Sequence, residues 1–138
     1  MASRIVVDSW AWVELFKASK TGGIAKERIE NADDVFTPSL VLAELAMKYL
    51  KEGEDQRLIH TWLQSISEAT QLVEVDIESA EESARAALEL ARKARDGGLG
   101  TPGLGDAIVL ATARICRAQV LTGDPHFKGL PETQWLGE

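Results

Sequence analysis

Short apolar runs typical of β-strands alternate with longer amphipathic segments along the chain. Ile5–Val7 precedes a segment with apolar residues at helical spacing, and Val35–Phe36 lies between two such segments. Strands joined through a helix pair in parallel, because the chain must cross one face of the sheet before it returns. Parallel sheets are covered by helices on both faces. The alternation therefore predicts an α/β fold around a short, mostly parallel central sheet.

The individual helices and strands can be placed from the spacing of apolar residues and from turn residues. Helices are expected at residues 10–16, 24–31, 40–50, 55–66, 76–95 and 104–117, and strands at 5–7, 35–36, 72–75, 119–121 and 134–136. Ser9 is expected to cap the first helix, and Lys20–Gly23 to break the helical pattern after it. Residues 97–103 form a glycine-rich loop. No repeat or linker divides the chain, so one domain over residues 1–138 is expected.

The acidic balance of the chain restricts how it can bind a nucleic acid. The 138 residues carry a formal net charge of −7, whereas affinity for phosphates usually comes from Lys and Arg. Either the partner is not a nucleic acid, or cations bridge the protein's carboxylates to the phosphates.

The sequence gives no sign of export or membrane insertion. It has no basic flank before a long apolar segment and no run of roughly 18 apolar residues. Cys116 is the single cysteine, and its apolar neighbours predict a buried, unreactive thiol. We expect a cytoplasmic protein that makes no membrane contact.

Four acidic residues occupy positions whose neighbours predict burial. Asp8 directly continues the strand Ile5–Val7, and Asp124 lies just beyond a later strand. Glu44 and Asp106 lie at helical spacing from apolar residues and share their buried faces. Burial of an unpaired carboxylate costs several kcal/mol, and the sequence offers no Lys or Arg at matching core positions.

The arrangement of these acids favours a divalent metal site. Residues just beyond the carboxyl ends of parallel strands converge where the strand order reverses. Clustered carboxylates raise one another's pKa unless a cation holds them ionised, and Mg²⁺ or Mn²⁺ suits oxygen ligands. We expect Asp8 and Asp106 to bind the ion directly, and Glu44 and Asp124 to bind it directly or through water. Such an ion activates water for in-line attack on a phosphate.

Each acid also has an ordinary structural interpretation. Asp8 is placed to cap a helix, and Asp124 to form a Gly-Asp-Pro turn. Asp106 lies near a helix start, where the helix dipole favours an acid, and Glu44 fits a half-exposed helix position. A metal site is favoured because it accounts for all four acids at once, whereas the structural interpretations require four independent explanations in one chain.

Four segments, taken in order, resemble the PIN-domain family and, within it, the VapC-type toxins of toxin–antitoxin pairs. They are residues 5–9 (IVVDS), 38–45 (PSLVLAEL), 105–113 (GDAIVLATA) and 121–127 (LTGDPHF). Each segment alone is a weak signal, but the ordered set is specific and covers essentially the whole chain.

The resemblance implies a three-layer αβα sandwich and a Mg²⁺- or Mn²⁺-dependent endoribonuclease. The family's metal-site acids are matched by Asp8, Glu44, Asp106 and Asp124. Thr122 matches a Ser or Thr that supports them, and Ser9 is a second expected supporting residue. The resemblance further implies an RNA substrate, a cognate antitoxin and a homodimer.

The chain departs from the family's pattern at two places. Trp10 and Trp12 are bulkier than the residues usual after the first acid, and we expect them on a partner surface. Gly103 stands where a capping Ser is common, which predicts a looser helix start. Whether His126, Lys93 or Arg95 contacts substrate is left open.

Two other functions compete with the ribonuclease. A phosphatase with an aspartyl nucleophile requires a second acid two residues after Asp8, where this chain has Trp10. A catalytically silent module of the same fold, acting through protein or RNA binding, stays open as the alternative.

Overall fold

A single parallel sheet forms the centre of the molecule in the computed structural model, which describes residues 2–137. Its strands are β1 (Arg4–Val7), β2 (Asp34–Pro38), β3 (Gln71–Val73), β4 (Gln119–Thr122) and β5 (Thr133–Trp135). Every neighbouring pair runs parallel. The predicted α/β class with a parallel central sheet is therefore confirmed.

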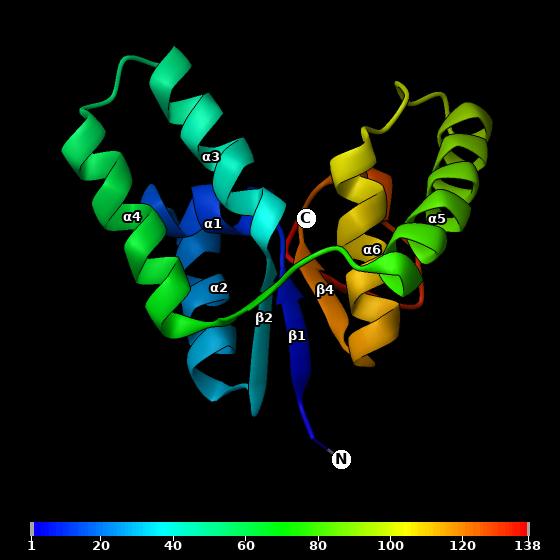
Figure 1. Cartoon of the computed structure of the whole chain (residues 1–138), viewed down its shortest axis with the longest axis horizontal. Coiled ribbons are helices and arrows are strands. Elements are labelled where there is room, and N and C mark those ends of the chain that lie inside the picture. The colour runs from blue at the N-terminus through cyan, green and yellow to red at the C-terminus, as the bar shows by residue number, and fades with distance from the viewer. Residues whose placement is uncertain (1, 138) are drawn as a thin grey trace.

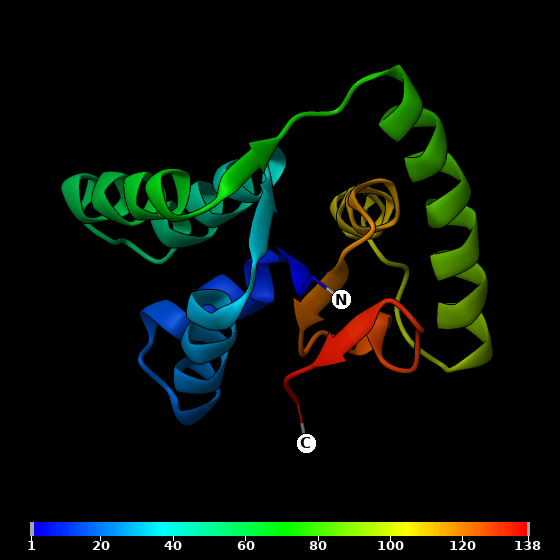
Figure 2. The ribbon, with the colours of Figure 1, turned by 90° about the horizontal axis from the view of Figure 1, so that it is seen from below.

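Helices cover both faces of this sheet. They are α1 (Ser9–Phe16), α2 (Lys20–Asn31), α3 (Ser39–Lys51), α4 (Gln56–Ala69), α5 (Ile77–Asp96) and α6 (Leu104–Cys116), with a short 3₁₀ turn η1 (Pro125–Phe127). Helices α1 to α4 lie on one side of the sheet and α5 and α6 on the other (Figures 1 and 2). The layering is the expected αβα sandwich.

The strand order places a switch point at the centre of the sheet. The order is β3-β2-β1-β4-β5, so the chain first builds outward from β1 to β3 and then crosses to the other side of β1 to add β4 and β5. Val7 pairs with Leu121 across β1 and β4. The residues that follow these two strands, including Asp8 and Asp124, therefore emerge side by side at the carboxyl edge of the sheet.

The core consists of the central strands and the helix faces packed on them. Val6 and Val7 of β1 and Val120 and Leu121 of β4 are completely buried, as expected for strands covered on both faces. Leu110 of α6 is equally buried beneath them. This rigid centre fixes the two strand ends from which the acids extend.

The start of α2 differs from the sequence prediction. Residues Lys20 to Gly23 were expected to break the helical pattern, but α2 begins at Lys20. The Ser19 hydroxyl accepts a hydrogen bond from the Gly22 amide and caps the helix. A Cβ at Gly22 would lie 2.0 Å from the Glu14 carbonyl oxygen, so this glycine allows α1 and α2 to touch.

Three smaller predictions also need correction. The cap of α1 is the Asp8 side chain, so the capping role predicted for Ser9 is wrong; Ser9 is instead the first residue of the helix. Trp12 is buried in the core and stacks on Phe16, which removes it from any partner surface. Cys116 is half-buried rather than buried, although burial still raises the pKa of its thiol.

Within residues 2–137, no helix combines the length and the apolar character needed to span a bilayer.

Candidate active site

Asp8 is held rigidly between α1 and β4. It directly follows β1, and its side chain is 4% exposed. One carboxylate oxygen accepts a hydrogen bond from the Ala11 amide at 3.0 Å, which caps α1. The other accepts from the Thr122 hydroxyl at 2.5 Å. Asp8 therefore caps α1, as its structural interpretation predicted, and also lies at the switch point of the sheet.

Thr122 connects two of the predicted acids. It ends β4 and is fully buried, and its hydroxyl donates to Asp8 while it accepts a hydrogen bond from the Asp124 amide at 3.0 Å. Asp124 in turn caps η1, because its carboxylate accepts from the His126 amide at 2.9 Å. One buried hydroxyl therefore fixes the spacing between the segments that carry Asp8 and Asp124.

Asp106 and Glu44 approach the same edge of the sheet from two helices. Asp106 lies in the first turn of α6, where the helix dipole favours a negative charge. Glu44 extends from α3 toward Gly105, the residue before Asp106. A Cβ added at Gly105 would lie 2.5 Å from a Glu44 carboxylate oxygen. The absence of a side chain at Gly105 leaves the space that Glu44 occupies.

The local electrostatics oppose full ionisation of these acids. Burial, with smaller contributions from the charges of Asp124 and Asp106, raises the pKa of Asp8 to about 7 despite its hydrogen bonds. Burial and the nearby Asp124 raise the pKa of Asp106 to about 6. Burial and Asp106 also raise the pKa of Glu44. A bound cation would relieve the repulsion that contributes to each of these shifts.

The structure adds His126 to this group. Its Nδ1 lies 3.0 Å from Asp124 and 3.9 Å from Asp106, and its Nε2 lies 2.8 Å from the Gly100 carbonyl oxygen. Burial lowers the pKa of His126, but the Gly100 carbonyl and Asp124 outweigh it, so the net pKa lies above the ordinary value. The sequence left the role of this histidine open, and its place two residues after Asp124 was the available signal.

The donor set fits a divalent cation. Asp106, Asp124 and His126 each offer one ligand atom, and these three atoms lie within 4.8 Å of one another. Carboxylate oxygens suit Mg²⁺ and Mn²⁺. Asp8 and Glu44 are electrostatically coupled to this group, and they lie outside the compact triad. Lys93 and Arg95 lie in the last turn of α5, ahead of the glycine-rich loop.

A pocket of about 310 Å³ opens beside the acids. Its lining combines α1, α3 and the turn after β4: Ser9, Trp10, Val13, Glu14, Glu44, Leu45, Lys48 and Asp124. Trp10 packs on the backbone of Gly123, where an added Cβ would lie 2.3 Å from the indole ring. Trp10 therefore forms one wall of the candidate active site next to Asp124.

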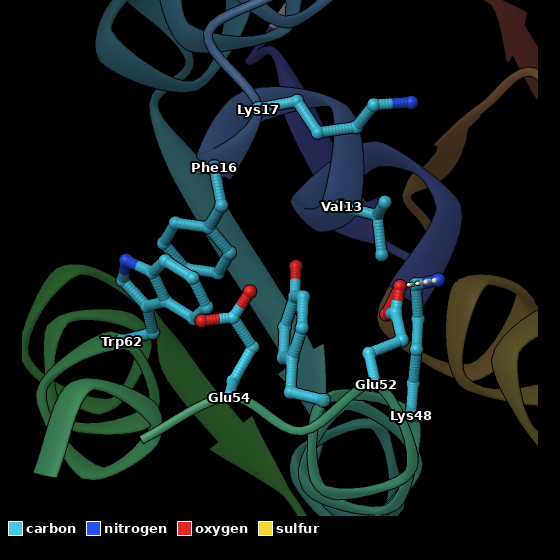
Figure 3. Close-up of a pocket in the computed structure, with 8 residues that line it drawn as sticks. Val13, Phe16, Lys17, Lys48, Glu52, Glu54 and Trp62 are labelled. Atoms are coloured by element: carbon cyan, nitrogen blue, oxygen red, sulfur yellow. Dashed lines mark hydrogen bonds and ion pairs between the residues drawn. The ribbon is translucent and has the colours of Figure 1, made fainter. Parts of the chain in front are cut away.

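A second pocket, of about 340 Å³, continues from the first and shares Val13 and Lys48 with it. Figure 3 shows the rings of Phe16 and Trp62 facing each other among the residues that line it. Their centroids are 5.2 Å apart. The Tyr49 side chain also lines this pocket, and its buried hydroxyl has no hydrogen-bond partner among the described residues. We call this second cavity the aromatic pocket.

The fold and the site together define an α/β protein with an acidic, metal-compatible centre at the switch point of a parallel sheet. The chain belongs to the PIN domain family, whose model matches residues 5–132. No curated protein matches the chain in sequence.

Several solved structures share this fold at low sequence identity. A chain of a toxin–antitoxin complex from Klebsiella pneumoniae is 20% identical, with a TM-score of 0.67 and coverage of 97% of this chain and 98% of that chain. VapBC-5 from Mycobacterium tuberculosis, a member of the VapBC family of toxin–antitoxin systems, gives 22% identity, a TM-score of 0.63 and 99% coverage of both chains. VapBC2 from Rickettsia felis, bound to a promoter DNA fragment, gives 16% identity, a TM-score of 0.67 and 96% coverage of both.

Proposed function

We propose that this protein is a Mg²⁺- or Mn²⁺-dependent endoribonuclease and the VapC-type toxin of a toxin–antitoxin pair. The observation that carries the proposal is the meeting of Asp8, Asp106 and Asp124 at the switch point, with Glu44 beside Asp106. Membership of the PIN domain family and the fold shared with toxin–antitoxin complexes support it. An RNA substrate is consistent with action in the cytoplasm.

The roles of the residues follow from their positions. Asp106 and Asp124 would hold the divalent ion, which supplies the Lewis acidity that activates water for attack on phosphorus. Asp8 would add negative charge from the buried side, and Thr122 holds its carboxylate in place. Glu44 lines the open pocket and would orient the attacking water. Ser9 lines the same pocket and would contact water or substrate.

The net charge of −7 fits this arrangement. Without a cation the carboxylates would repel the phosphate backbone, because both carry negative charge. With a cation in place the same carboxylates become the means of binding the phosphate. Substrate affinity should therefore depend on the divalent ion as well as on basic side chains.

Cleavage of total RNA by the purified protein tests the activity. We expect fragments with Mn²⁺ or Mg²⁺, and none with EDTA or with Asp106→Asn. Asp96→Asn is the matched control, because Asp96 is an exposed acid at the end of α5. Metal-independent cleavage, or full activity of Asp106→Asn, would rule out the proposed mechanism.

The aromatic pocket supports a second part of the proposal, the binding of a cognate antitoxin. Its buried Tyr49 hydroxyl has no hydrogen-bond partner among residues 2–137. Glu54 adds negative charge beside it, and Glu52 pairs with Lys48 at the rim. These features suit an extended segment with an apolar side chain for Phe16 and Trp62 and a Lys or Arg near the acids. Because the pocket continues to Asp124 through Val13 and Lys48, a bound segment would cover the active site.

Charge reversal at the pocket rim tests this binding without disturbing the core. Glu54 is exposed, and we expect Glu54→Arg to weaken antitoxin affinity by about tenfold or more, as for a lost charge pair at an interface. RNA cleavage by the free variant should stay at the wild-type rate. His60→Ala, an exposed change on α4, is the control. Unchanged affinity of Glu54→Arg would place the antitoxin elsewhere.

A further inference from the structure

The imidazole of His126 is fixed by contacts at both ring nitrogens. Nε2 lies 2.8 Å from the carbonyl oxygen of Gly100, in the glycine-rich loop before α6. Nδ1 lies 3.0 Å from a carboxylate oxygen of Asp124 and 3.9 Å from one of Asp106. The side chain is 22% exposed, so its orientation is set by these partners.

The contact with Gly100 determines which ring nitrogen carries the hydrogen in neutral His126. A backbone carbonyl can only accept, so Nε2 must donate to it. The lone pair then resides on Nδ1 and faces Asp106 and Asp124, whose ionised oxygens are also acceptors. These three acceptor atoms lie within 4.8 Å of one another, close enough for one cation to contact all of them.

No lysine or arginine in the described part of the chain pairs with Asp106 or Asp124; Lys48 lines the pocket beside Asp124 but pairs with Glu52. Among residues 2–137, the only basic side chain in an ion pair with Asp106 or Asp124 is His126 itself. Metal-ligating histidines characteristically donate their second ring N–H to a carboxylate or a backbone carbonyl, which fixes the tautomer and aims the other nitrogen. The contact between Nε2 and Gly100 matches that arrangement.

We propose that His126 Nδ1 is a nitrogen ligand of the active-site ion, beside Asp106 and Asp124, and that it makes the site prefer Mn²⁺ to Mg²⁺. The inference rests on the proposed metal-dependent function and assigns one more ligand to it. Imidazole suits transition metals, whereas Mg²⁺ favours an all-oxygen environment. The glycine-rich loop acquires a role as well, because its Gly100 carbonyl holds the ligand in position.

Pulsed EPR of the Mn²⁺-loaded protein tests the assignment directly. A coordinated imidazole gives ¹⁴N modulation of the Mn²⁺ signal, and we expect it in the wild type. The chain has two histidines, so His126→Asn and His60→Asn cover both sources. The modulation should vanish in His126→Asn and persist in His60→Asn, since His60 is exposed on α4.

Metal affinity provides the second measurement. Calorimetry should show the dissociation constant for Mn²⁺ rising in His126→Asn by about 10- to 100-fold, the range typical of changes around a metal site. The constant for Mg²⁺ should change much less, so the preference for Mn²⁺ falls.

The outcomes separate this assignment from the proposed function. Mn²⁺ binding without ¹⁴N modulation, or an unchanged preference in His126→Asn, would overturn the ligand role of His126 while metal-dependent cleavage stands. In that case His126 is protonated and pairs with Asp124 as an ion pair. A wild-type protein that binds no Mn²⁺ would overturn both.

Discussion

At the scale of single residues, Asp8 combines a structural and an electrostatic role. Its carboxylate caps α1 and accepts the Thr122 hydroxyl, yet burial raises its pKa to about 7. A buried carboxylate is destabilising when it is ionised without a cation. In the proposed metal-dependent enzyme, this position would favour metal binding at the expense of the stability of the metal-free protein.

Asp8→Asn isolates this cost. Because the folded state holds the Asp8 proton more tightly than the unfolded state, whose pKa is near 3.8, wild-type stability falls as pH rises from about 4 to about 7. Asn cannot ionise, so the free energy of unfolding of the variant should rise relative to that of the wild type across this window. Above the window, at pH 8 in EDTA, the difference should be on the order of 4 kcal/mol. Chemical denaturation at several pH values measures the difference. A constant difference from pH 4 to pH 8 would contradict the raised pKa.

Thr122→Val tests the residue that connects the acids. The change keeps the shape but removes the hydroxyl that donates to Asp8. Because that hydrogen bond lowers the pKa of Asp8, its loss should raise the pKa further and move the onset of Mn²⁺ binding to higher pH. Calorimetric titration with Mn²⁺ at pH 6 to 9 detects the shift, and Thr122→Ser should restore the profile. A profile equal to the wild type's would assign Thr122 a packing role only.

At the scale of elements, glycines decide how closely neighbouring segments can approach. Gly22 allows contact between α2 and the α1 backbone, Gly105 leaves space for Glu44, and Gly123 supports the Trp10 ring. Two of these contacts, at Gly105 and Gly123, shape the candidate active site. The first turn of α2 contains two glycines and still forms a helix, because Gly22 packs against the α1 backbone.

Gly22→Ala and Gly23→Ala form a matched pair within that first turn. An added methyl at Gly22 meets the Glu14 backbone, whereas at Gly23 nothing lies within 4 Å. Gly22→Ala should destabilise the protein by about 1–3 kcal/mol through overpacking, and Gly23→Ala should stabilise it by up to about 1 kcal/mol through helix propensity. Thermal or urea unfolding gives both values. Equal effects at the two sites would contradict the close α1–α2 contact.

At the scale of the whole molecule, apolar side chains are exposed near the crossover between the two halves of the sheet. Leu72, Val75 and Ile77 are exposed along the crossover from β3 to α5, and the Ile77 side chain is 81% exposed. In Figure 1 this segment runs from the side of the sheet covered by α4 to the side covered by α5. We propose that it contributes to the homodimer expected from the family resemblance, since a second copy would remove these side chains from water.

Ile77→Glu tests that interface. A charge placed in an apolar interface is costly, so we expect the wild type to elute as a dimer and the variant as a monomer of about 15 kDa at micromolar concentration. Size-exclusion chromatography with light scattering measures the mass. Leu88→Glu is the control, because Leu88 is also exposed but lies farther along α5. A dimer that persists in Ile77→Glu would place the interface on another face.

Local patterns in the sequence were sufficient for most of the fold. The predicted ends of strands and helices agree with the structure to within a few residues at most positions. A strand buried on both faces appears in the sequence as a β-branched run such as Ile5–Val7, and a helix such as α6 appears as apolar residues at helical spacing. The four acids stood out locally because each interrupts an apolar pattern, but the predicted burial is correct only for Asp8. Glu44, Asp106 and Asp124 are half-buried, because the carboxyl edge of the sheet opens into a pocket there. The break predicted at Lys20–Gly23 was wrong because close packing against α1, a non-local effect, outweighs glycine's low helix propensity.

The sequence by itself determined the parallel α/β architecture and named the candidate acids, because both depend on the spacing of neighbouring residues. Only the tertiary structure decided the distances. It placed Thr122 between Asp8 and Asp124, and it brought His126 from the turn after β4 against Asp106 of α6. Such contacts depend on strand order and on which backbones approach closely, and the periodicity of a single segment contains neither.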